Sequence, residues 1–405
     1  MNTETATQWI LDQQQPALER LMAWCDQNSW SMDQANLVQM ADTLATDFAS
    51  FGVEFERVDL PDLRLLGDSE DWDRAPTGPA LLWHHHPGAA KAKRVLLMIH
   101  YDTVYPAGTE PSTCRLHQDP TSMQQRLVGP GVADAKGGIA VIALAVEAML
   151  KFGLLDDIGL SILLNPDEEI GSTASAALIK ELCPQFGSAL LFEPSLPDGS
   201  LVANRKGSGN FSIVVRGKSA HAGRNPEMGR NAIVRLAEVI QRLQKHHHPS
   251  EGVTINVGNI CGGGALNRVP DHATAKLNVR VIDRDAQLKV ESELESIAED
   301  FSGDGYVVKT LGEFHCPPKR VDARIGRIQQ VVEKAASLAG QPAVRWQDTG
   351  GACDGSKLAA WGLPNIDTMG VCGGNLHSPD EFMIADSLAT SAVQTMLSVL
   401  LAAAD

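Results

Sequence analysis

The sequence lacks the features that mark several broad classes of protein. Its 34 Lys and Arg are outnumbered by 50 Asp and Glu, which gives a formal net charge of −16 and leaves no basic stripe. A nucleic-acid-binding protein needs such a stripe to neutralise phosphates, so we expect no nucleic-acid partner. Long apolar runs are also missing, because the run at residues 139–146 is ended by Glu147, far short of a membrane span. We therefore expect no membrane partner.

Paired cysteines are missing as well. The seven cysteines are dispersed without a Cys-X-X-Cys pair, and an odd, scattered set is typical of reduced thiols in a cytosolic protein. The first ten residues, MNTETATQWI, do not have the basic-then-apolar layout of a secretory signal. Both observations favour a cytoplasmic location. The composition that remains, 43% hydrophobic and 21% charged over 405 residues, is that of a globular chain long enough for two domains.

Buried strands alternate with helices in the first half of the chain. Residues 5–27 and 32–51 predict two amphipathic helices, and Ser31 with Gln34 resembles a capping box for the second. A Pro-Gly turn between the apolar strands at 80–86 and 94–100 favours a hairpin. Further apolar strands and helices follow up to residue 192, and this alternation predicts a mostly parallel α/β sheet.

The pattern changes after Lys206 to strands that alternate between apolar and polar residues. The order β-α-β-β-α-β over residues 208–314 predicts a small split sheet with two helices on one face. The α/β pattern then resumes, so the small domain is an insertion. We predict one domain from residues 1–207 and 315–405, and a second from 208–314.

Five side chains with metal-binding chemistry lie at the ends of predicted strands or in the loops after them. Each alone has an ordinary structural interpretation, such as a cap or a solvated acidic turn, but their recurrence at strand ends favours function. Two His and three carboxylates suit two neighbouring divalent ions when one carboxylate bridges them, with positions left open for water and substrate. The set therefore indicates hydrolysis, and its members are His100, Asp134, Glu169, Glu193 and His377.

The segment NPDEEIGS is the most informative of these. A buried strand runs into Asp167, Glu168 and Glu169, and three adjacent carboxylates repel one another unless a cation is present. One of them can bind metal while its neighbour accepts a proton from water, because carboxylates in different environments titrate apart. Asp102, two places after His100, is able to fix the imidazole tautomer.

Other candidates remain ambiguous from the residues alone. His221 in GKSAHAG lies between a predicted strand and helix, where a lone His is usually a surface residue. Arg280 pairs either with a substrate carboxylate or with a neighbouring Asp. Lys136 is a candidate to balance the charge of the Asp134 segment. The His runs at 84–86 and 246–248 are not expected to bind metal, because three consecutive residues cannot converge on one ion.

The order and spacing of eight motifs resemble a known family over roughly residues 85–405. The chain is similar to the di-zinc family of glutamate carboxypeptidase, acetylornithine deacetylase and succinyl-diaminopimelate desuccinylase, most closely to bacterial glutamate carboxypeptidase. This family has a zinc-binding α/β domain and an inserted lid that forms a dimer interface. The motifs are HYDTV, GPGVADAKGG, DEEIGS, FEP, GKSAHAG, GGGALNRVPD, TGGACDGS and LHSPDEF.

The resemblance implies a role for each metal-binding candidate. One zinc ion would be bound by His100 and Glu193. The other would be bound by Glu169 and His377, with Asp134 as the bridge between the two ions. Cobalt or manganese would also suit this ligand set.

For catalysis, the resemblance implies that Asp102 orients the imidazole of His100 and that Glu168 is the general base. His221 matches a lid histidine that polarises the scissile carbonyl in the active site of the partner subunit, across a homodimer. The substrate carboxylate would be held by Asn267 and Arg280. The glycine-rich substrate loop would contain Gly350, Gly351 and Asp354.

Substrate specificity is narrowed only in part. A Glu at position 193 is typical of the carboxypeptidase and deacylase members, and aminopeptidase members tend to carry Asp there. The basic residues that hold a glutamate side chain are not evident near Ser200 or in GEFHCPP, which leaves Arg205 and Lys206 as substitutes. We expect a zinc-dependent hydrolase of an amide bond beside a free carboxylate, acting on a small peptide or an N-acyl amino acid. The alternatives are an aminopeptidase or dipeptidase and a non-catalytic binding protein on the same fold.

Overall fold

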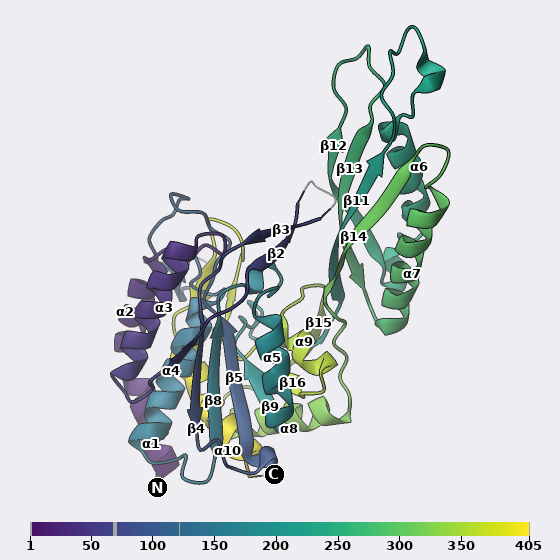
Figure 1. Ribbon diagram of the computed structural model, residues 1–405. Coiled ribbons are helices and arrows are strands. Elements are labelled where there is room, and N and C mark those ends of the chain that lie inside the picture. Colours follow the sequence, from purple (N-terminus) through teal and green to yellow (C-terminus); the bar gives the residue numbers. More distant parts are fainter. Residues whose placement is uncertain (1, 68–70, 121, 405) are drawn as a thin grey trace.

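The chain folds into a large domain and an inserted lid, as Figure 1 shows for this computed structural model, which describes residues 2–67, 71–120 and 122–404. The chain enters the lid after β10 (Leu201–Arg205) and leaves it through β14 (Val307–Cys316). Both chain ends lie at the end of the large domain that points away from the lid (Figure 1). The α/β class with an inserted α+β lid, expected from the sequence, is confirmed.

A six-stranded sheet forms the centre of the large domain, in the order β1-β4-β8-β5-β9-β16. Strands β8, β5, β9 and β16 are parallel, and β1 and β4 are antiparallel to their neighbours. The hairpin expected between β4 and β5 is wrong, because β8 lies between them. β8 is buried along its whole length, which requires an inner position in the sheet. The strands span Glu56–Val58 (β1), Ala80–His85 (β4), Gly159–Asn165 (β8), Arg94–His100 (β5), Ser188–Leu191 (β9) and Asn365–Ile366 (β16).

Helices cover both faces of this sheet. In β5, Leu97 and Ile99 pack into the core on one face, and Leu96 and Met98 pack into the core on the other. This is why the strand is a continuous apolar run. The first face carries α1 (Asn2–Asp12), α2 (Gln14–Cys25), α3 (Gln34–Ala49), α4 (Lys136–Lys151), α8 (Ala323–Leu338) and α10 (Ser387–Ala402). The second carries α5 (Ala176–Leu182) and α9 (Asp354–Ala360). None of the helices in the described ranges is long and apolar enough to cross a membrane.

The carboxyl ends of the parallel strands meet at the edge of the sheet beside the lid. β5 ends at His100 and β8 at Asn165, which pair in register. The loop after β8 carries Glu168 and Glu169, and the loop after β9 carries Glu193. Ligand-binding groups in open α/β sheets collect at this edge, because the loops that leave parallel strands converge there.

Three smaller sheets complete the large domain, and two of them were not expected from the sequence. The hairpin of β2 (Leu63–Leu66) and β3 (Trp72–Ala75) extends from the large domain toward the lid sheet (Figure 1). A four-stranded sheet has the order β17-β18-β7-β6. Its strands are β17 (Gly373–Gly374), β18 (Phe382–Ile384), β7 (Gln125–Val128) and β6 (Arg115–Gln118). The third sheet pairs β10 with β15 (Trp346–Thr349).

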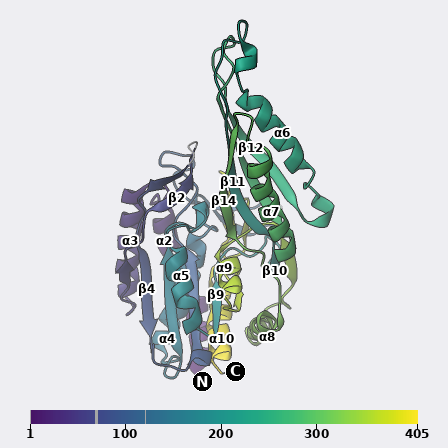
Figure 2. The ribbon, with the colours of Figure 1, turned by 45° about the vertical axis from the view of Figure 1, so that its right-hand side comes forward.

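The lid has the element order β-α-β-β-α-β, and its antiparallel sheet has the order β12-β13-β11-β14. Helices α6 and α7 lie together on one face of this sheet (Figure 2). Their apolar residues form a separate core with the sheet, and the other face carries polar side chains. The elements span Gly207–Arg216 (β11), Ala232–Gln244 (α6), Thr254–Gly262 (β12), His272–Val281 (β13) and Arg284–Asp300 (α7).

Two local expectations near the N-terminus are wrong. The helix expected at 5–27 is divided into α1 and α2 at Gln13. The N-cap of α3 is Asp33, whose side chain accepts the backbone N–H of Asn36. Ser31 lies further upstream and its hydroxyl instead donates to the carboxylate of Asp102 at 2.7 Å. A serine hydroxyl is able either to cap a helix or to form a tertiary hydrogen bond. In Ser31 it forms the tertiary bond, to the buried carboxylate of Asp102.

Candidate metal centre

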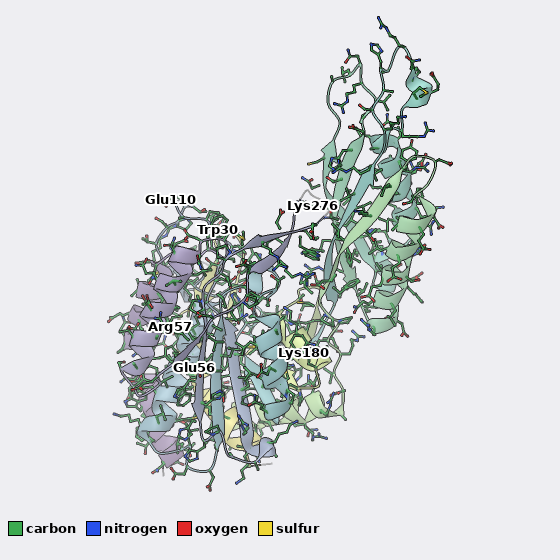
Figure 3. The ribbon with its side chains drawn as sticks, viewed as in Figure 1. Trp30, Glu56, Arg57, Glu110, Lys180 and Lys276 are labelled. Carbon is green, nitrogen blue, oxygen red and sulfur yellow. The ribbon has the colours of Figure 1, made fainter. Side chains whose placement is uncertain are left out.

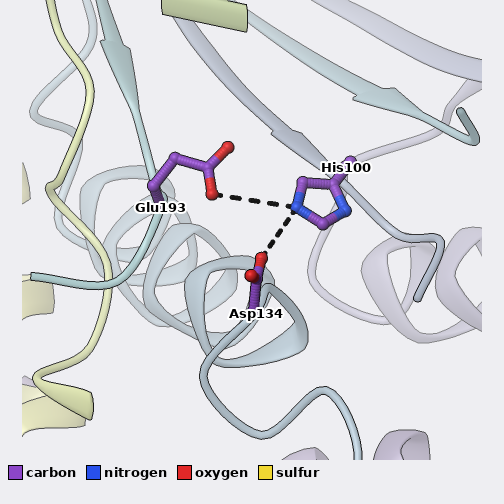
Figure 4. Close-up of side chains that lie close together, drawn as sticks. All are labelled: His100, Asp134 and Glu193. Atoms are coloured by element: carbon purple, nitrogen blue, oxygen red, sulfur yellow. Dashed lines mark hydrogen bonds and ion pairs between the residues drawn. The ribbon is translucent and has the colours of Figure 1, made fainter. Parts of the chain in front are cut away.

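Five side chains from separate segments converge beyond the carboxyl edge of the large sheet. His100 ends β5, Glu193 follows β9, and Asp134 precedes α4, and these three meet as Figure 4 shows. Asp134 also meets the other two side chains, Glu169 and His377. In each group of three, one ligand atom per residue lies within 4.8 Å of the others. The structure thus brings all five sequence-predicted ligands together, in two triads that share one residue.

Asp134 belongs to both triads and turns one carboxylate oxygen toward the histidine of each. Its Oδ1 is 3.1 Å from Nε2 of His100, and its Oδ2 is 3.3 Å from Nε2 of His377. Glu193 Oε2 lies 3.8 Å from the same nitrogen of His100. Glu169 Oε2 lies 3.1 Å from the same nitrogen of His377. A carboxylate in this arrangement is able to bind two ions at once.

His377 has an unusual backbone conformation. It has a φ of 60°, a left-handed conformation that is uncommon for a residue with a side chain. Strain of this kind persists where surrounding structure holds it, and it is concentrated at functional sites. The side chain of His377 is 54% exposed, whereas that of His100 is 1% exposed. One side of the centre is therefore open to solvent.

The ionisation of these groups fits a site that holds a cation. Burial and then the charge of Asp134 raise the pKa of Glu169 to about 7. Hydrogen bonds to Asp134 and Glu169 raise the pKa of His377 to about 11. Burial lowers the pKa of His100, but its hydrogen bonds to three carboxylates outweigh burial and raise that pKa well above its ordinary value. At both imidazoles, the neighbouring carboxylates therefore favour a positive charge.

A buried polar atom supports the same interpretation. Glu169 Oε1 has no hydrogen-bond partner among the described residues, although it is buried. Buried carboxylate oxygens are normally paired, so an orphaned one in the triad with Asp134 and His377 indicates a missing partner of positive charge. The donor set of imidazole nitrogens and carboxylate oxygens fits zinc, and it also fits cobalt or manganese. The residues present therefore fit a pair of divalent ions.

Asp102 connects the His100 side of the site to the acidic loop. Nδ1 of His100 lies 3.0 Å from the backbone oxygen of Asp102 and 3.3 Å from its carboxylate, which leaves Nε2 for a metal. The Asp102 carboxylate also accepts the backbone N–H groups of Glu168 and Glu169, at 3.1 and 3.2 Å. Burial and the charge of Glu193 raise the pKa of Glu168 well above its ordinary value. A carboxylate with a raised pKa is suited to accept and return a proton near neutral pH.

Sequence reasoning missed Glu381, which organises the loop that carries Asp134. The Glu381 side chain is completely buried, and its carboxylate accepts four hydrogen bonds. The donors are the hydroxyl of Tyr105 at 2.7 Å and the backbone N–H groups of Gly131 at 3.2 Å, Ala133 at 2.9 Å and Asp134 at 3.0 Å. Because Glu381 comes four residues after His377, it joins the two ligand-bearing loops. The only indication in the sequence was its place in the LHSPDEF motif.

Two buried ion pairs support segments that adjoin the centre. Lys357 Nζ lies 2.7 Å from Asp354, whose carboxylate also accepts the side-chain amide of Asn165 and the hydroxyl of Ser172. Asp354, expected in the substrate loop, is thus a buried structural anchor in this conformation. The second pair is Arg205 with Asp367, at 2.8 and 3.0 Å.

Arg205 and Lys136 do not occupy the positions expected of them. Besides its two bonds to Asp367, the Arg205 guanidinium donates to the backbone oxygen of Gly351 at 3.2 Å. Arg205 is 7% exposed, so it holds this loop and is not presented to a substrate. Lys136 points away from Asp134, and its Nζ donates to the backbone oxygens of Trp24 and Gln27 at 3.0 and 2.6 Å.

The sequence-predicted lid residues fall into two groups. Arg280 lies where the lid joins the large domain, and its guanidinium donates to the backbone oxygen of Gly350 at 3.2 Å. His221 and Asn267 lie together near the opposite end of the lid, where the backbone N–H of Ala222 donates to the backbone oxygen of Asn267. Both side chains are exposed. The chain thus brings Arg280 and Gly350 together but leaves His221 and Asn267 apart from its own metal centre.

Comparison with known proteins agrees with this geometry. Residues 203–305 match the M20 family model of the peptidase dimerisation domain. The chain is 31% identical over 294 residues to carboxypeptidase G2 of a Pseudomonas species, covering 71% of this chain and 68% of that protein. The chain belongs to the M20 peptidase family. It is accordingly a metal-dependent hydrolase that acts on peptide bonds.

Two further M20 relatives indicate how varied this group is. The chain is 30% identical over 284 residues to succinyl-diaminopimelate desuccinylase of Gluconacetobacter diazotrophicus, covering 65% of this chain and 70% of that protein. The crystal structure of an M20 family metallo-carboxypeptidase from Sulfolobus solfataricus superposes with a TM-score of 0.72 at 18% identity. That match covers 96% of this chain and 99% of the other and shows the shared fold.

Proposed function

We propose that the protein is a zinc-dependent hydrolase that cleaves an amide bond beside a free carboxylate, in a small peptide or an N-acyl amino acid. The observation that carries the proposal is the position of Asp134, with one oxygen toward His100 and the other toward His377. His100 and Glu193 would hold one zinc ion, and Glu169 and His377 the other. When bound, the ions would polarise the scissile carbonyl and make water acidic enough to react near neutral pH.

Glu168 is proposed as the general base. It stands beside Glu169 on a loop whose backbone is fixed by Asp102, so its side chain is held next to the metal centre. Its raised pKa allows it to accept the proton of the attacking water and to return it to the leaving amine. Asp102 would keep Nδ1 of His100 protonated, which directs Nε2 to the metal.

Arg280 is proposed to bind the substrate carboxylate, with Gly350 and Gly351 forming the adjoining loop. The Arg280 guanidinium is half-buried at the base of the lid, and within the described part of the chain it donates only to the side chain of Asn278 and the backbone oxygen of Gly350. Its remaining N–H groups are free, among the described residues, to form a bidentate pair with a carboxylate. Asn267 would complete this contact from the lid of a partner subunit.

His221 is likewise proposed to act in the active site of a partner subunit. Its Nδ1 accepts the backbone N–H groups of Gly223 and Arg224, at 3.1 and 3.2 Å. This leaves the proton on Nε2, and the exposed imidazole is able to donate it in a hydrogen bond. Such a donor is suited to stabilise the oxyanion that develops on the scissile carbonyl.

The lid has the surface that a homodimer requires. β12 is an edge strand of the lid sheet, and large apolar side chains are exposed on it and on α6. Unpaired edges and exposed apolar patches of this kind are typical of subunit interfaces. They include Ile233 at 41%, Val234 at 53% and Ile260 at 59% exposure. We propose a homodimer formed through the lid, located in the cytoplasm.

Turnover of matched substrates tests the proposed reaction. The zinc-loaded protein should hydrolyse N-acetylated dipeptides at least as fast as the same dipeptides with a free amine, and a chelator should abolish the activity. A preference for the free amine would instead identify the enzyme as an aminopeptidase or dipeptidase. No turnover of either class would favour a non-catalytic binding protein.

Subunit exchange tests the shared site. Mixing the inactive variants His221→Ala and Glu168→Ala should restore part of the activity, because a mixed dimer contains one site with both residues intact. The absence of any rescue, when exchange of subunits is verified by labelled chains, would contradict action of His221 across the dimer.

A further inference from the structure

Glu168 and Glu169 lie in a tight turn after β8, at residues 167–172, which we call the acidic turn. The backbone N–H of Gly171 donates to the oxygen of Glu168 at 2.8 Å. The N–H of Ser172 donates to the oxygen of Asp167 at 2.6 Å and closes the turn. Gly171 and Ser172 have φ values of 95° and 53°, so two consecutive residues are left-handed. Glycine adopts this conformation freely but serine does not, so contacts of Ser172 must stabilise it.

The contact that stabilises Ser172 is a buried hydrogen bond to Asp354. The Ser172 hydroxyl donates to the Asp354 carboxylate, and the two residues are 0% and 2% exposed. A hydrogen bond to a charged acceptor is stronger than one between neutral groups, so it is able to offset the cost of a left-handed serine. Asp354 begins α9, which packs beside α5, the helix that follows the acidic turn and carries Lys180 (Figure 3).

The Asp354 carboxylate is itself held in place by two further side chains. Nζ of Lys357, one turn further along α9, lies 2.7 Å away. Nδ2 of Asn165 donates to the carboxylate at 2.9 Å, and Asn165 ends β8 beside His100. Burial raises the pKa of Asp354, but the charge of Lys357 and the hydrogen bonds outweigh burial and lower that pKa. Ser172 is therefore bound to an anion that is fixed to the central sheet.

The acidic turn is thus anchored at both of its ends. Asp102 accepts the backbone N–H groups of Glu168 and Glu169 near the start of the turn. Asp354 binds Ser172 at its end. If the second anchor were lost, the backbone at Ser172 could relax toward a right-handed conformation. The residues nearest to Ser172 would move most, and Glu169 is nearer than Glu168.

We propose that Asp354 is a positioning residue, which acts through the hydroxyl of Ser172 to hold Glu169 at the metal centre and Glu168 beside it. The inference rests on the proposed function and deepens it. It assigns to a segment expected to contact substrate the task of fixing a metal ligand and the base.

The proposal predicts unequal effects on the two proposed zinc ions. The ion that Glu169 and His377 would hold depends on the acidic turn for one of its ligands. The ion that His100 and Glu193 would hold takes its ligands from the ends of β5 and β9, which the turn does not carry. A general loss of stability would not discriminate between the two.

Ser172→Ala tests the proposal without breaking the buried ion pair, because Asp354 and Lys357 are both retained. Zinc titration against a chromophoric chelator should show one site weakened by about 10–100-fold, the usual effect of a lost outer-shell contact. The other site should stay within about threefold of the wild type. kcat should fall with little change in KM, since the base is displaced as well. Unchanged affinity at both sites, or equal weakening of both, would overturn the proposal.

Ser172→Gly separates the hydrogen bond from the backbone strain. It also lacks the hydroxyl, but glycine accepts a left-handed φ, so the variant should unfold at a higher temperature than Ser172→Ala. It should still show the selective loss of zinc affinity. Wild-type affinity in Ser172→Gly would show that the backbone holds the turn without Asp354 and would refute the proposal. If Ser172→Ala fails to fold, this variant decides alone.

Ser200→Ala is the matched control. Ser200 is completely buried in the turn before β10, and its hydroxyl donates to the carboxylate of Asp198 at 3.0 Å. The variant removes the same kind of bond outside the acidic turn, so it should lower the unfolding temperature and leave both zinc affinities and kcat unchanged. A selective loss of one zinc site in Ser200→Ala would contradict the assignment to Asp354.

Zinc affinity is measured without substrate, so two kinds of failure are distinct. Hydrolysis of N-acyl substrates together with wild-type zinc affinities in both Ser172 variants would leave the proposed reaction intact and refute only this inference. Selective weakening of one zinc site in a protein that hydrolyses no amide would refute the proposed function and support the anchoring of Glu169 by Asp354.

Discussion

The carboxylate of Asp102 accepts a hydrogen bond from the backbone N–H of Glu168 at 3.1 Å. The same carboxylate lies 3.3 Å from Nδ1 of His100 and is itself held by the hydroxyl of Ser31. One buried side chain therefore sets the orientation of a proposed metal ligand and the position of the proposed base. The backbone position of Glu168 is therefore fixed by Asp102 and not by the carboxylate of Glu168 itself.

Replacing Glu168 by Gln should therefore remove the proton acceptor without moving the loop. The backbone N–H that binds Asp102 is unchanged, and the amide has nearly the shape of the carboxylate. We expect kcat to fall by about 10²–10⁴-fold with little change in bound zinc, since this is the usual effect of removing a general base. Steady-state kinetics with metal analysis measures both. Glu181→Gln, at an exposed position of α5, is the matched control, and full turnover by Glu168→Gln would rule out the role.

Replacing Glu381 by Gln should weaken metal binding. A glutamine has one acceptor oxygen, so it cannot accept all four hydrogen bonds that Glu381 accepts, and a backbone N–H in the Asp134 loop loses its partner. Outer-shell changes of this kind typically lower metal affinity by about 10–100-fold. Competition with a chromophoric chelator measures the affinity. Tyr105→Phe removes only one donor and should have a smaller effect, and an unchanged affinity in Glu381→Gln would show that the contact is dispensable.

The buried Asp367 should make stability depend on acid pH. Burial raises the pKa of Asp367, but the charges of Arg205 and Lys319 outweigh burial and hold the pKa well below its ordinary value. The unfolded chain therefore takes up this proton first as the pH falls, below about pH 4, and the free energy of unfolding decreases in that range. The contribution is fully present at neutral pH.

Asp367→Asn should be less stable than the wild type at pH 7 by about 3–5 kcal/mol, because it leaves two buried cations without their partner. Its free energy of unfolding should also decrease less between pH 5 and pH 3. Urea unfolding at several pH values measures both. Asp12→Asn, at an exposed position of α1, should reproduce the wild-type profile. An Asp367→Asn profile parallel to that of the wild type would contradict the assignment.

The convergence of the five side chains could be anticipated because their segments have strong local patterns. Continuous apolar runs identify β5, β8 and β9 as buried strands, and parallel strands place the residues after them at one edge. The order of those strands could not be anticipated. The apolar sequences of β4 and β5 are compatible with pairing to each other or to β8. Only the packing of the whole sheet places β8 between them.

Residues that act through tertiary contacts were the ones missed. Glu381 lies in an acidic, polar segment that resembles a solvated loop, yet its side chain is completely buried. There it accepts backbone N–H groups of residues about 250 positions away in the sequence. The β2–β3 hairpin was missed because its strands have four residues each and little apolar alternation. Ser31 was assigned to a local cap for the same reason, since its partner Asp102 is distant in sequence.

The most direct test of the two-metal centre is the zinc content of Asp134→Ala. Metal analysis after dialysis against dilute zinc should give two zinc ions per chain for the wild type. The variant should retain one at most and lose nearly all activity, because Asp134 is the side chain that faces both His100 and His377. Two tightly bound zinc ions and substantial turnover in Asp134→Ala would contradict the account.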